Sequence, residues 1–243
     1  TIKGTSGTLS SGSYTNKAFS YSATDSGSGI NYLQYKKPGS STWTSYTSGT
    51  TIPATSTNGW YYFRAYDNAG NVSAESSVCL DTAVPTGTVY KETTSVSSGS
   101  SVKGAYIKFI ATDSLSGVAN CYVKAPGETS YKSYTSNSPL TTEGVYQFYI
   151  VDRAGNQSST YSVALDNTAP TGMVYGGTTE KPSGSIVNSS YIKFIGSDNA
   201  SGVSAMYVKK PGSSSFISYT SGTQFTADGK YEFYCVDGAG NQS

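Results

Sequence analysis

Histidine is absent from this 243-residue chain, and charged residues make up only 13% of it. The lack of histidine excludes Ser-His-Asp and Cys-His catalysis and zinc sites with histidine ligands. The 16 Lys and Arg residues balance 15 Asp and Glu residues without forming a basic run. Because nucleic acids bind clustered cations, we expect no nucleic-acid partner.

Long apolar stretches are also missing. No segment approaches the roughly 20 apolar residues that a membrane helix needs, so we expect no membrane insertion. No signal peptide is recognisable, so we interpret the sequence as a mature or trimmed fragment. We expect it to be a monomer within a longer chain.

One phrase, Asp-x-Ala-Gly-Asn, occurs three times at a constant spacing. It begins at Asp67, Asp152 and Asp237, which are 85 residues apart each time. A constant period of this length indicates a tandem array of units of about 80 residues. We therefore predict domains at 1–83, 84–168 and 169–243. The third lacks a counterpart of the stretch YSVALD (161–166), so we expect either that the native protein continues beyond this fragment or that the last strand is missing or supplied from elsewhere.

The second unit shows most clearly what one repeat contains. Short segments rich in β-branched and aromatic residues alternate with turns such as Pro126-Gly127. We predict strands over 106–113, 118–124, 145–151 and the last residues of the unit, about seven strands in all, with no helical periodicity. This pattern predicts an all-β chain of antiparallel sandwiches.

Each unit also has the phrase Gly-x-Tyr-x-Phe before its strongest strand, with the tyrosine at Tyr61, Tyr146 and Tyr231. A tyrosine two residues before a buried core residue at the start of strand F is the tyrosine corner of immunoglobulin-like sandwiches. We therefore predict three tandem immunoglobulin-like domains in an elongated array.

Several further phrases recur in order. They are Asp-x-x-Ser-Gly-Val/Ile, an aromatic-x-Ser-Tyr hairpin, and a linker such as LDTAVPTG (Leu80–Gly87). Together with the two phrases above, they resemble the bacterial immunoglobulin-like repeats of cell-surface proteins, adhesins and multidomain secreted enzymes. The resemblance implies a secreted or cell-wall protein at the bacterial surface that is not itself an enzyme.

The Asp-x-Ala-Gly-Asn phrase has two interpretations. In the first it is a turn, in which the aspartate accepts backbone N–H bonds, the glycine takes a positive φ, and the asparagine tolerates the same region. In the second it contributes to calcium sites where one domain follows another. The two candidate calcium clusters are Asp81, Asp113 and Asp152, and Asp166, Asp198 and Asp237; we expect no other cofactor or metal.

A pattern of tyrosines suggests a binding surface. On strand C of the second unit we expect Ala119, Cys121 and Val123 to point inward, which leaves Tyr122 exposed. On strand F the same alternation leaves Tyr149 exposed beside it. The third unit repeats the pair as Tyr207 and Tyr234, and the first unit has Gln34 and Arg64 there. These residues form either a cross-strand pair that steadies the sheet or a surface that recognises a ligand.

Each unit has one cysteine: Cys79, Cys121 and Cys235. Each stands where the other units have an apolar residue, so we expect free, buried thiols rather than disulfides or metal ligands.

Two classes of function follow. The first is a non-catalytic stalk or adhesin segment. The second is a specific binding module for a host surface protein, an immunoglobulin or a glycan, through the tyrosine-bearing face. The carboxylates lie scattered in turns, which gives no support to an enzyme.

Overall fold

The computed structural model describes all residues from 1 to 243 and consists of strands and turns. Its contacts divide the chain into two compact units. The first contains Thr1–Gly87, Ala111–Tyr122 and Tyr149–Ser159, and the second contains Thr88–Ile110, Val123–Phe148 and Thr160–Ser243. The structure contains no helix that is long and apolar enough to span a membrane.

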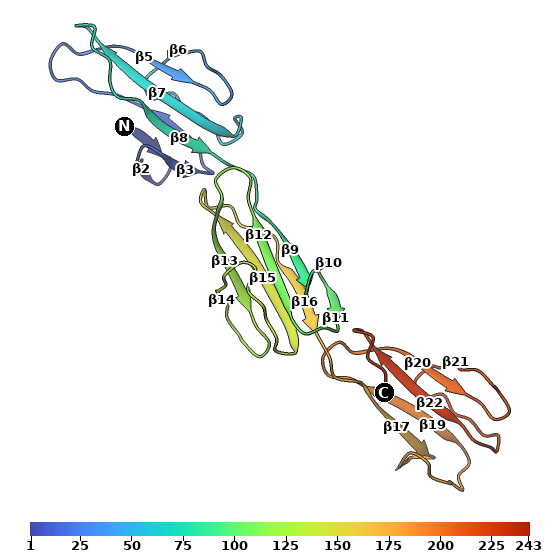
Figure 1. The fold of residues 1–243 in the computed structure, drawn as a ribbon. Coiled ribbons are helices and arrows are strands. Elements are labelled where there is room, and N and C mark those ends of the chain that lie inside the picture. Colours follow the sequence, from blue (N-terminus) through green and yellow to red (C-terminus); the bar gives the residue numbers. More distant parts are fainter. The chain divides into compact units, whose positions relative to one another are not determined.

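Residues 1–83, called the first repeat here, form two sheets with the strand orders β2-β1-β4 and β3-β8-β7-β5-β6. The pairs are antiparallel, except that β3 runs parallel to β8. Figure 1 labels most of these strands. They are β1 (Ile2–Gly4), β2 (Gly7–Leu9), β3 (Ser13–Thr15), β4 (Phe19–Tyr21), β5 (Ile30–Lys36), β6 (Thr44–Tyr46), β7 (Gly59–Asp67) and β8 (Ser76–Leu80).

Residues 84–168, the second repeat, show the same strand order, β10-β9-β12 and β11-β16-β15-β13-β14. Both compact units share this repeat. Its strands are β9 (Thr86–Lys91), β10 (Thr94–Val96), β11 (Ser100–Val102), β12 (Ile107–Thr112), β13 (Val118–Lys124), β14 (Lys132–Ser133), β15 (Gly144–Asp152) and β16 (Tyr161–Leu165).

Residues 169–243, the third repeat, have shorter sheets, β18-β17-β19 and β21-β20-β22. The structure has no third-repeat strand in the place of β8 or β16. The strands are β17 (Thr171–Gly176), β18 (Thr179–Lys181), β19 (Ile192–Ser197), β20 (Val203–Lys209), β21 (Ile217–Ser218) and β22 (Glu232–Asp237).

The all-β sandwich prediction is confirmed, with some differences in detail. The predicted strands at 106–113, 118–124 and 145–151 correspond to β12, β13 and β15. Three strands that open the second repeat, β9 to β11, were not predicted individually, because Ser and Thr dominate their sequences. Each of the first two repeats therefore has eight strands instead of about seven.

The expected inward position of Ala119 is wrong, since this residue is exposed whereas Cys121 and Val123 are buried. The corresponding strands of the other repeats explain why. In β5 the register shifts between Ile30 and Tyr32, and in β20 it shifts between Val203 and Ala205. A bulge of this kind adds one residue and reverses the alternation before it.

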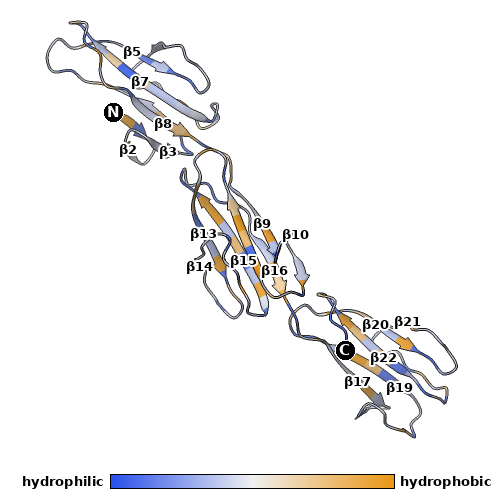
Figure 2. Ribbon diagram, viewed as in Figure 1, coloured by the Kyte–Doolittle hydropathy of each residue, from blue (hydrophilic) through white to orange (hydrophobic).

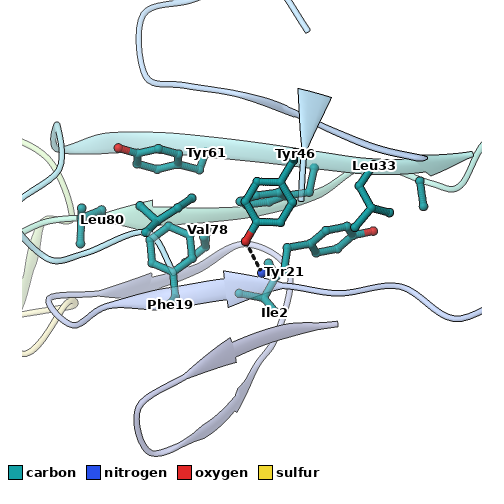
Figure 3. Packing of buried hydrophobic residues seen from close by; sticks show 11 residues of the cluster. Ile2, Phe19, Tyr21, Leu33, Tyr46, Tyr61, Val78 and Leu80 are labelled. Carbon is teal, nitrogen blue, oxygen red and sulfur yellow. Dashed lines mark hydrogen bonds between the residues drawn. The ribbon is translucent and has the colours of Figure 1, made fainter. Parts of the chain in front are cut away.

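The core of the first repeat is aromatic and lies between its two sheets (Figure 3). Side chains of β7 alternate between buried and partly exposed along the strand, so Tyr61 and Phe63 point inward. Figure 2, coloured by hydropathy, shows hydrophobic and hydrophilic residues mixed along the same strand, for example along β15. Burying these large rings removes apolar area from water, which favours folding.

Tyrosine hydroxyls satisfy backbone groups at the ends of this core. The Tyr61 hydroxyl donates to the Thr57 carbonyl at 2.9 Å, and the hydroxyls of Tyr146 and Tyr231 donate to the carbonyls four residues before them. These bonds confirm the tyrosine corner. A second set of tyrosines, Tyr46, Tyr134 and Tyr219, accepts from the backbone N–H of Tyr21, Phe109 and Phe194.

The three cysteines are free and buried, as predicted. Burial raises the pKa of the Cys79 thiol to about 11, and the charges of Asp81 and Asp113 add to the rise. Burial likewise raises the pKa of Cys121 to about 11. These two thiols therefore stay protonated and unreactive at neutral pH.

Replacing Tyr46 by Phe should destabilise the first repeat by about 1–3 kcal/mol, because the buried N–H of Tyr21 would lose its hydrogen-bond partner. Both tryptophans, Trp43 and Trp60, lie in the first repeat. Urea unfolding followed by tryptophan fluorescence therefore reports on this repeat alone. The control is Tyr32→Phe, because the Tyr32 side chain is 44% exposed; equal losses in the two variants would contradict the assignment.

Candidate functional site

The Asp-x-Ala-Gly-Asn phrase forms the same turn in all three repeats. The carboxylate of Asp152 accepts the backbone N–H of Asn156 at 2.8 Å, and Asp67 and Asp237 accept from Asn71 and Asn241 in the same way. Gly155 has φ 93°, so the prediction of a positive φ is confirmed. The asparagines do not share this backbone conformation; their side chains bond instead to the aspartates.

In the second repeat the asparagine makes one further bond. Asn156 Nδ2 donates to Asp152 Oδ2 at 2.7 Å and also to the backbone carbonyl of Asp81 at 2.8 Å. Asp81 directly follows β8, the last strand of the first repeat. The turn therefore holds the end of the preceding repeat.

The carboxylate of Asp81 completes this contact. It accepts the N–H of Ser116 at 3.0 Å and the N–H of Ala83 at 3.0 Å. Asp81 is fully buried and Ser116 is 1% exposed. A buried carboxylate that lacked these donors would be costly, so the bonds fix the segment that leaves the first repeat. We call Asp81, Ser116 and Asn156 the first joint; all three lie in the first compact unit.

The second joint consists of Asp166, Ser201 and Asn241, all within the second compact unit. Asn241 Nδ2 donates to the Asp166 carbonyl at 3.0 Å, and the Ser201 N–H donates to Asp166 Oδ2 at 3.2 Å. The Ser201 hydroxyl also bonds to this oxygen. The bonds from the asparagine Nδ2 and from the serine N–H thus recur 85 residues later, whereas the hydroxyl of Ser116 bonds to Asp113 instead of Asp81. The serines were not singled out from the sequence, although they stand at a fixed place in Asp-x-x-Ser-Gly.

The joints also differ at the asparagine Oδ1. In the first, Asn156 Oδ1 accepts from Asn16 Nδ2 at 3.1 Å. In the second, Asn241 Oδ1 is buried without a hydrogen-bond partner. Asn16 directly follows β3, and Lys103 stands at the same place after β11. The asparagine amide that donates in the first joint is therefore replaced by a lysine in the second repeat. An unsatisfied buried oxygen weakens the second joint relative to the first.

The predicted carboxylate clusters do assemble. Ligand oxygens of Asp81, Asp113 and Asp152 lie within 4.8 Å of one another, and those of Asp166, Asp198 and Asp237 do the same. Such spacing and charge fit calcium, which takes six to eight oxygen ligands. The carboxylates also accept protein N–H groups; Asp113 Oδ1 accepts from Leu115 at 3.2 Å and from Gly117 at 2.6 Å.

Hydrogen bonds favour the charged form of two turn aspartates, Asp67 and Asp237. The side chain of Asn71, followed by other donors, lowers the pKa of Asp67. For Asp237, burial alone would raise the pKa, but the bonds from Asn241 and nearby amides outweigh it and leave the pKa lowered. A carboxyl with a lowered folded pKa stabilises the fold above its unfolded pKa of about 3.9, and this contribution is lost as the pH falls through the folded pKa.

The structure places the tyrosine pairs of the candidate binding surface side by side. Tyr122 and Tyr149 stack with centroids 4.7 Å apart, and so do Tyr207 and Tyr234. All four rings are partly exposed. In the first repeat, Arg64 donates two hydrogen bonds to Gln34 Oε1, at 2.9 and 2.7 Å.

The first repeat adds rings that the sequence did not single out. The guanidinium of Arg64 lies 4.1 Å from the centroid of Trp43 and 5.2 Å from that of Tyr66, and Tyr66 stacks on Tyr32 at 4.6 Å. These contacts join Trp43, Tyr66 and Tyr32 to the Gln34/Arg64 pair. In the sequence, only the recurring aromatic-x-Ser-Tyr hairpin, which contains Trp43, pointed to one of these rings.

No family model matches the chain, and no curated protein matches it. Solved structures that it resembles include the fibronectin(III)-like modules of Clostridium thermocellum CbhA. That comparison has 17% identity and a TM-score of 0.31, covering 68% of this chain and 93% of the other.

A second is the SGBP-B protein of the Bacteroides ovatus mixed-linkage glucan utilization locus, solved with a mixed-linkage heptasaccharide. It has 14% identity and a TM-score of 0.19, covering 88% of this chain and 63% of the other. At these identities and TM-scores neither likeness assigns a function. The all-β, immunoglobulin-like assignment rests on the sheets, the strand order and the tyrosine corners of this chain itself.

Replacing Asn156 by Ala should loosen the first joint. We expect the Ser116 amide, which donates to Asp81, to exchange with solvent about 10-fold faster, equal to the loss of about 1.4 kcal/mol. Asn71→Ala is the matched control, because Asn71 bonds its own Asp67 and should leave Ser116 unchanged. Amide hydrogen exchange by NMR makes the measurement; an unchanged rate at Ser116 in Asn156→Ala would refute the role of this side chain.

Proposed function

We propose that the chain is a non-catalytic stalk segment of an extracellular bacterial surface protein or adhesin. One observation carries the proposal: an aspartate, a serine and an asparagine at equivalent positions build a joint twice. A catalytic site would be needed once, whereas a spacer needs the same connection after every repeat. The domain boundaries at 1–83, 84–168 and 169–243 belong to this proposal, since the joints bring together groups from both sides of 83/84 and 168/169.

Burial and hydrogen bonding explain how such a joint would restrict the linker between two repeats. Asp81 and Asp166 are fully buried, and each is held by a serine N–H and an asparagine amide from the following repeat. A linker fixed in this way cannot rotate without leaving buried polar groups unpaired. We therefore propose that consecutive repeats move together.

The test is NMR relaxation of backbone ¹⁵N nuclei on the complete chain. We expect the first and second repeats to share one rotational correlation time. In Asn156→Ala the first repeat should tumble faster than the second, whereas Asn71→Ala should behave like the parent. Independent tumbling of the repeats in the parent chain would rule out a stiff stalk.

Calcium at the two carboxylate clusters is part of the same proposal. The support is the spacing of the oxygens and the burial of Asp81, Asp152, Asp166 and Asp237. The relaxation experiment is therefore repeated with calcium and with a chelator. Tighter coupling and a higher melting temperature in calcium would support an ion in the joints; identical results would leave the hydrogen bonds as the whole connection.

A second candidate function is specific binding through the tyrosine-bearing face. The supporting observation is that the second and third repeats present a stacked tyrosine pair at equivalent positions, while the first presents the Gln34/Arg64 pair with its rings. Tyrosine gives rigid, amphipathic contact area, which suits both protein and glycan surfaces. The proposed partners are a host surface protein, an immunoglobulin or a glycan.

This candidate is tested by a binding screen of the complete chain against host immunoglobulins, mucins, matrix proteins and a glycan array. We expect a saturable partner to lose at least about 10-fold in affinity when Tyr122, Tyr149, Tyr207 and Tyr234 are replaced by Ser. The control replaces Tyr90 and Tyr175 by Ser, because these lie on β9 and β17 in the other sheets. Undiminished binding by the fourfold variant would remove this face from the proposal.

A further inference from the structure

The loop before strand F is longer in the first repeat than in the other two. Six residues, Pro53–Asn58, lie between Ile52 and the glycine that precedes the tyrosine corner. Three residues fill the same place in the second repeat (141–143) and in the third (226–228). The residue before this loop forms an equivalent bridge in every repeat, and the tyrosine corner follows it in every repeat. The extra residues therefore change the loop and leave the sandwich around it the same.

This longer loop forms part of a pocket of about 440 Å³, a volume within the range of small-ligand sites. Pro53, Ser56 and Thr57 of the loop line it, together with Tyr35 from the end of β5 and Lys37 from the turn that follows. All of its lining residues belong to the first repeat and to the first compact unit.

A second difference between the repeats lies at the same place. Tyr35 stands in β5 where the other repeats have Val123 and Val208, both of which are buried. The tyrosine is only partly buried, and its ring centroid lies 5.3 Å from that of Tyr46, which also lines the pocket. The first repeat therefore presents an aromatic ring to this pocket where the others bury a smaller aliphatic side chain.

The lining of the pocket combines rings, hydroxyls and one cation. Besides the tyrosines, its hydroxyl-bearing residues are Ser45, Thr47, Thr50, Thr51, Ser56 and Thr57. Lys37 is the only charged residue among those that line it, and it is exposed. The Lys37 ammonium lies 5.6 Å from the centroid of the Tyr35 ring. Burial raises the pKa of Tyr61 at the base, whereas a bond to Ser56 and the charge of Lys37 lower it. The pocket therefore suits a polar ligand with one negative charge.

We propose that this pocket binds a sugar residue that carries one anionic group, a carboxylate or a sulfate. The anionic group accepts hydrogen bonds from the Lys37 ammonium, and the apolar face of the sugar ring lies against Tyr35. The sugar hydroxyls bond to the serine and threonine hydroxyls. The inference goes beyond the stalk and tyrosine-face proposals, because none of the pocket residues belongs to a joint or to the tyrosine-bearing face.

The test is an NMR titration of the complete chain with three anionic sugars: methyl glucuronide, N-acetylneuraminic acid and glucose 6-sulfate. We expect at least one of them to shift the backbone amides of Lys37, Ser56 and Thr57 saturably. The sulfate compared with the two carboxylates identifies the anionic group. Methyl glucoside and acetate should bind at least about 10-fold more weakly, because the first lacks the charge and the second lacks the ring.

Three variants copy features of the other repeats, which fold without the pocket residues. They are Tyr35→Val, Lys37→Ala as at Ala125, and replacement of Pro53–Asn58 by Thr-Thr-Asn, which has the loop length of the second repeat. Each should weaken binding at least about 10-fold, and Lys37→Ala should also abolish the preference for an anionic over a neutral sugar. Tryptophan fluorescence in urea checks that each variant folds; if one does not, the other two decide the outcome.

The matched control is Lys210→Ala, because Lys210 stands at the place of Lys37 in the third repeat, where the loop is short. This variant should bind like the parent. So should the fourfold tyrosine variant, which separates the pocket from the tyrosine-bearing face. The proposal is overturned if none of the three anionic sugars binds, if methyl glucoside or acetate binds as tightly as they do, or if shortening the loop leaves binding undiminished.

Discussion

The connection between repeats depends on two buried carboxylates, those of Asp81 and Asp166. Neither has access to water, so each must receive hydrogen bonds from the protein. Each carboxylate accepts a serine N–H of the following repeat, and the backbone carbonyl of the same aspartate accepts an asparagine side chain of that repeat. Because this asparagine also closes its own turn through Asp152 or Asp237, one side chain links the local turn to the chain segment before it.

Central strand F (β7, β15 and β22) organises each sandwich. Where it is paired on both edges, as in β7 and β15, nine residues are extended and the tyrosine and phenylalanine at its start are buried. Where one edge is free, as in β22, the strand shortens to six residues and the same rings become partly exposed. Alternating aromatic residues are therefore not sufficient to bury these rings. The pairing of the strand on both edges also affects how deeply they are buried.

A close approach of two loops fixes the start of the same strand. Gly144 has φ 126°, and a Cβ built on it would lie 2.6 Å from Pro126 Cβ. The Pro-Gly turn after strand C and the glycine before strand F are therefore parts of one contact, although about 18 residues separate them. Any side chain at Gly144 would push the turn away and strain the backbone.

The sequence alone determined the period, the all-β class, the tyrosine corner, the buried thiols and the outward tyrosine pairs, because each depends on local spacing or alternation. It also predicted the two groups of three aspartates whose side-chain oxygens lie within 4.8 Å of one another. Only the tertiary structure decided that the asparagine reaches the preceding repeat, that Ser116 and Ser201 complete the joints, and that Ala119 is exposed at the place where the register shifts in β5 and β20. These depend on groups far apart in sequence and on a register shift of one residue, which no local pattern specifies.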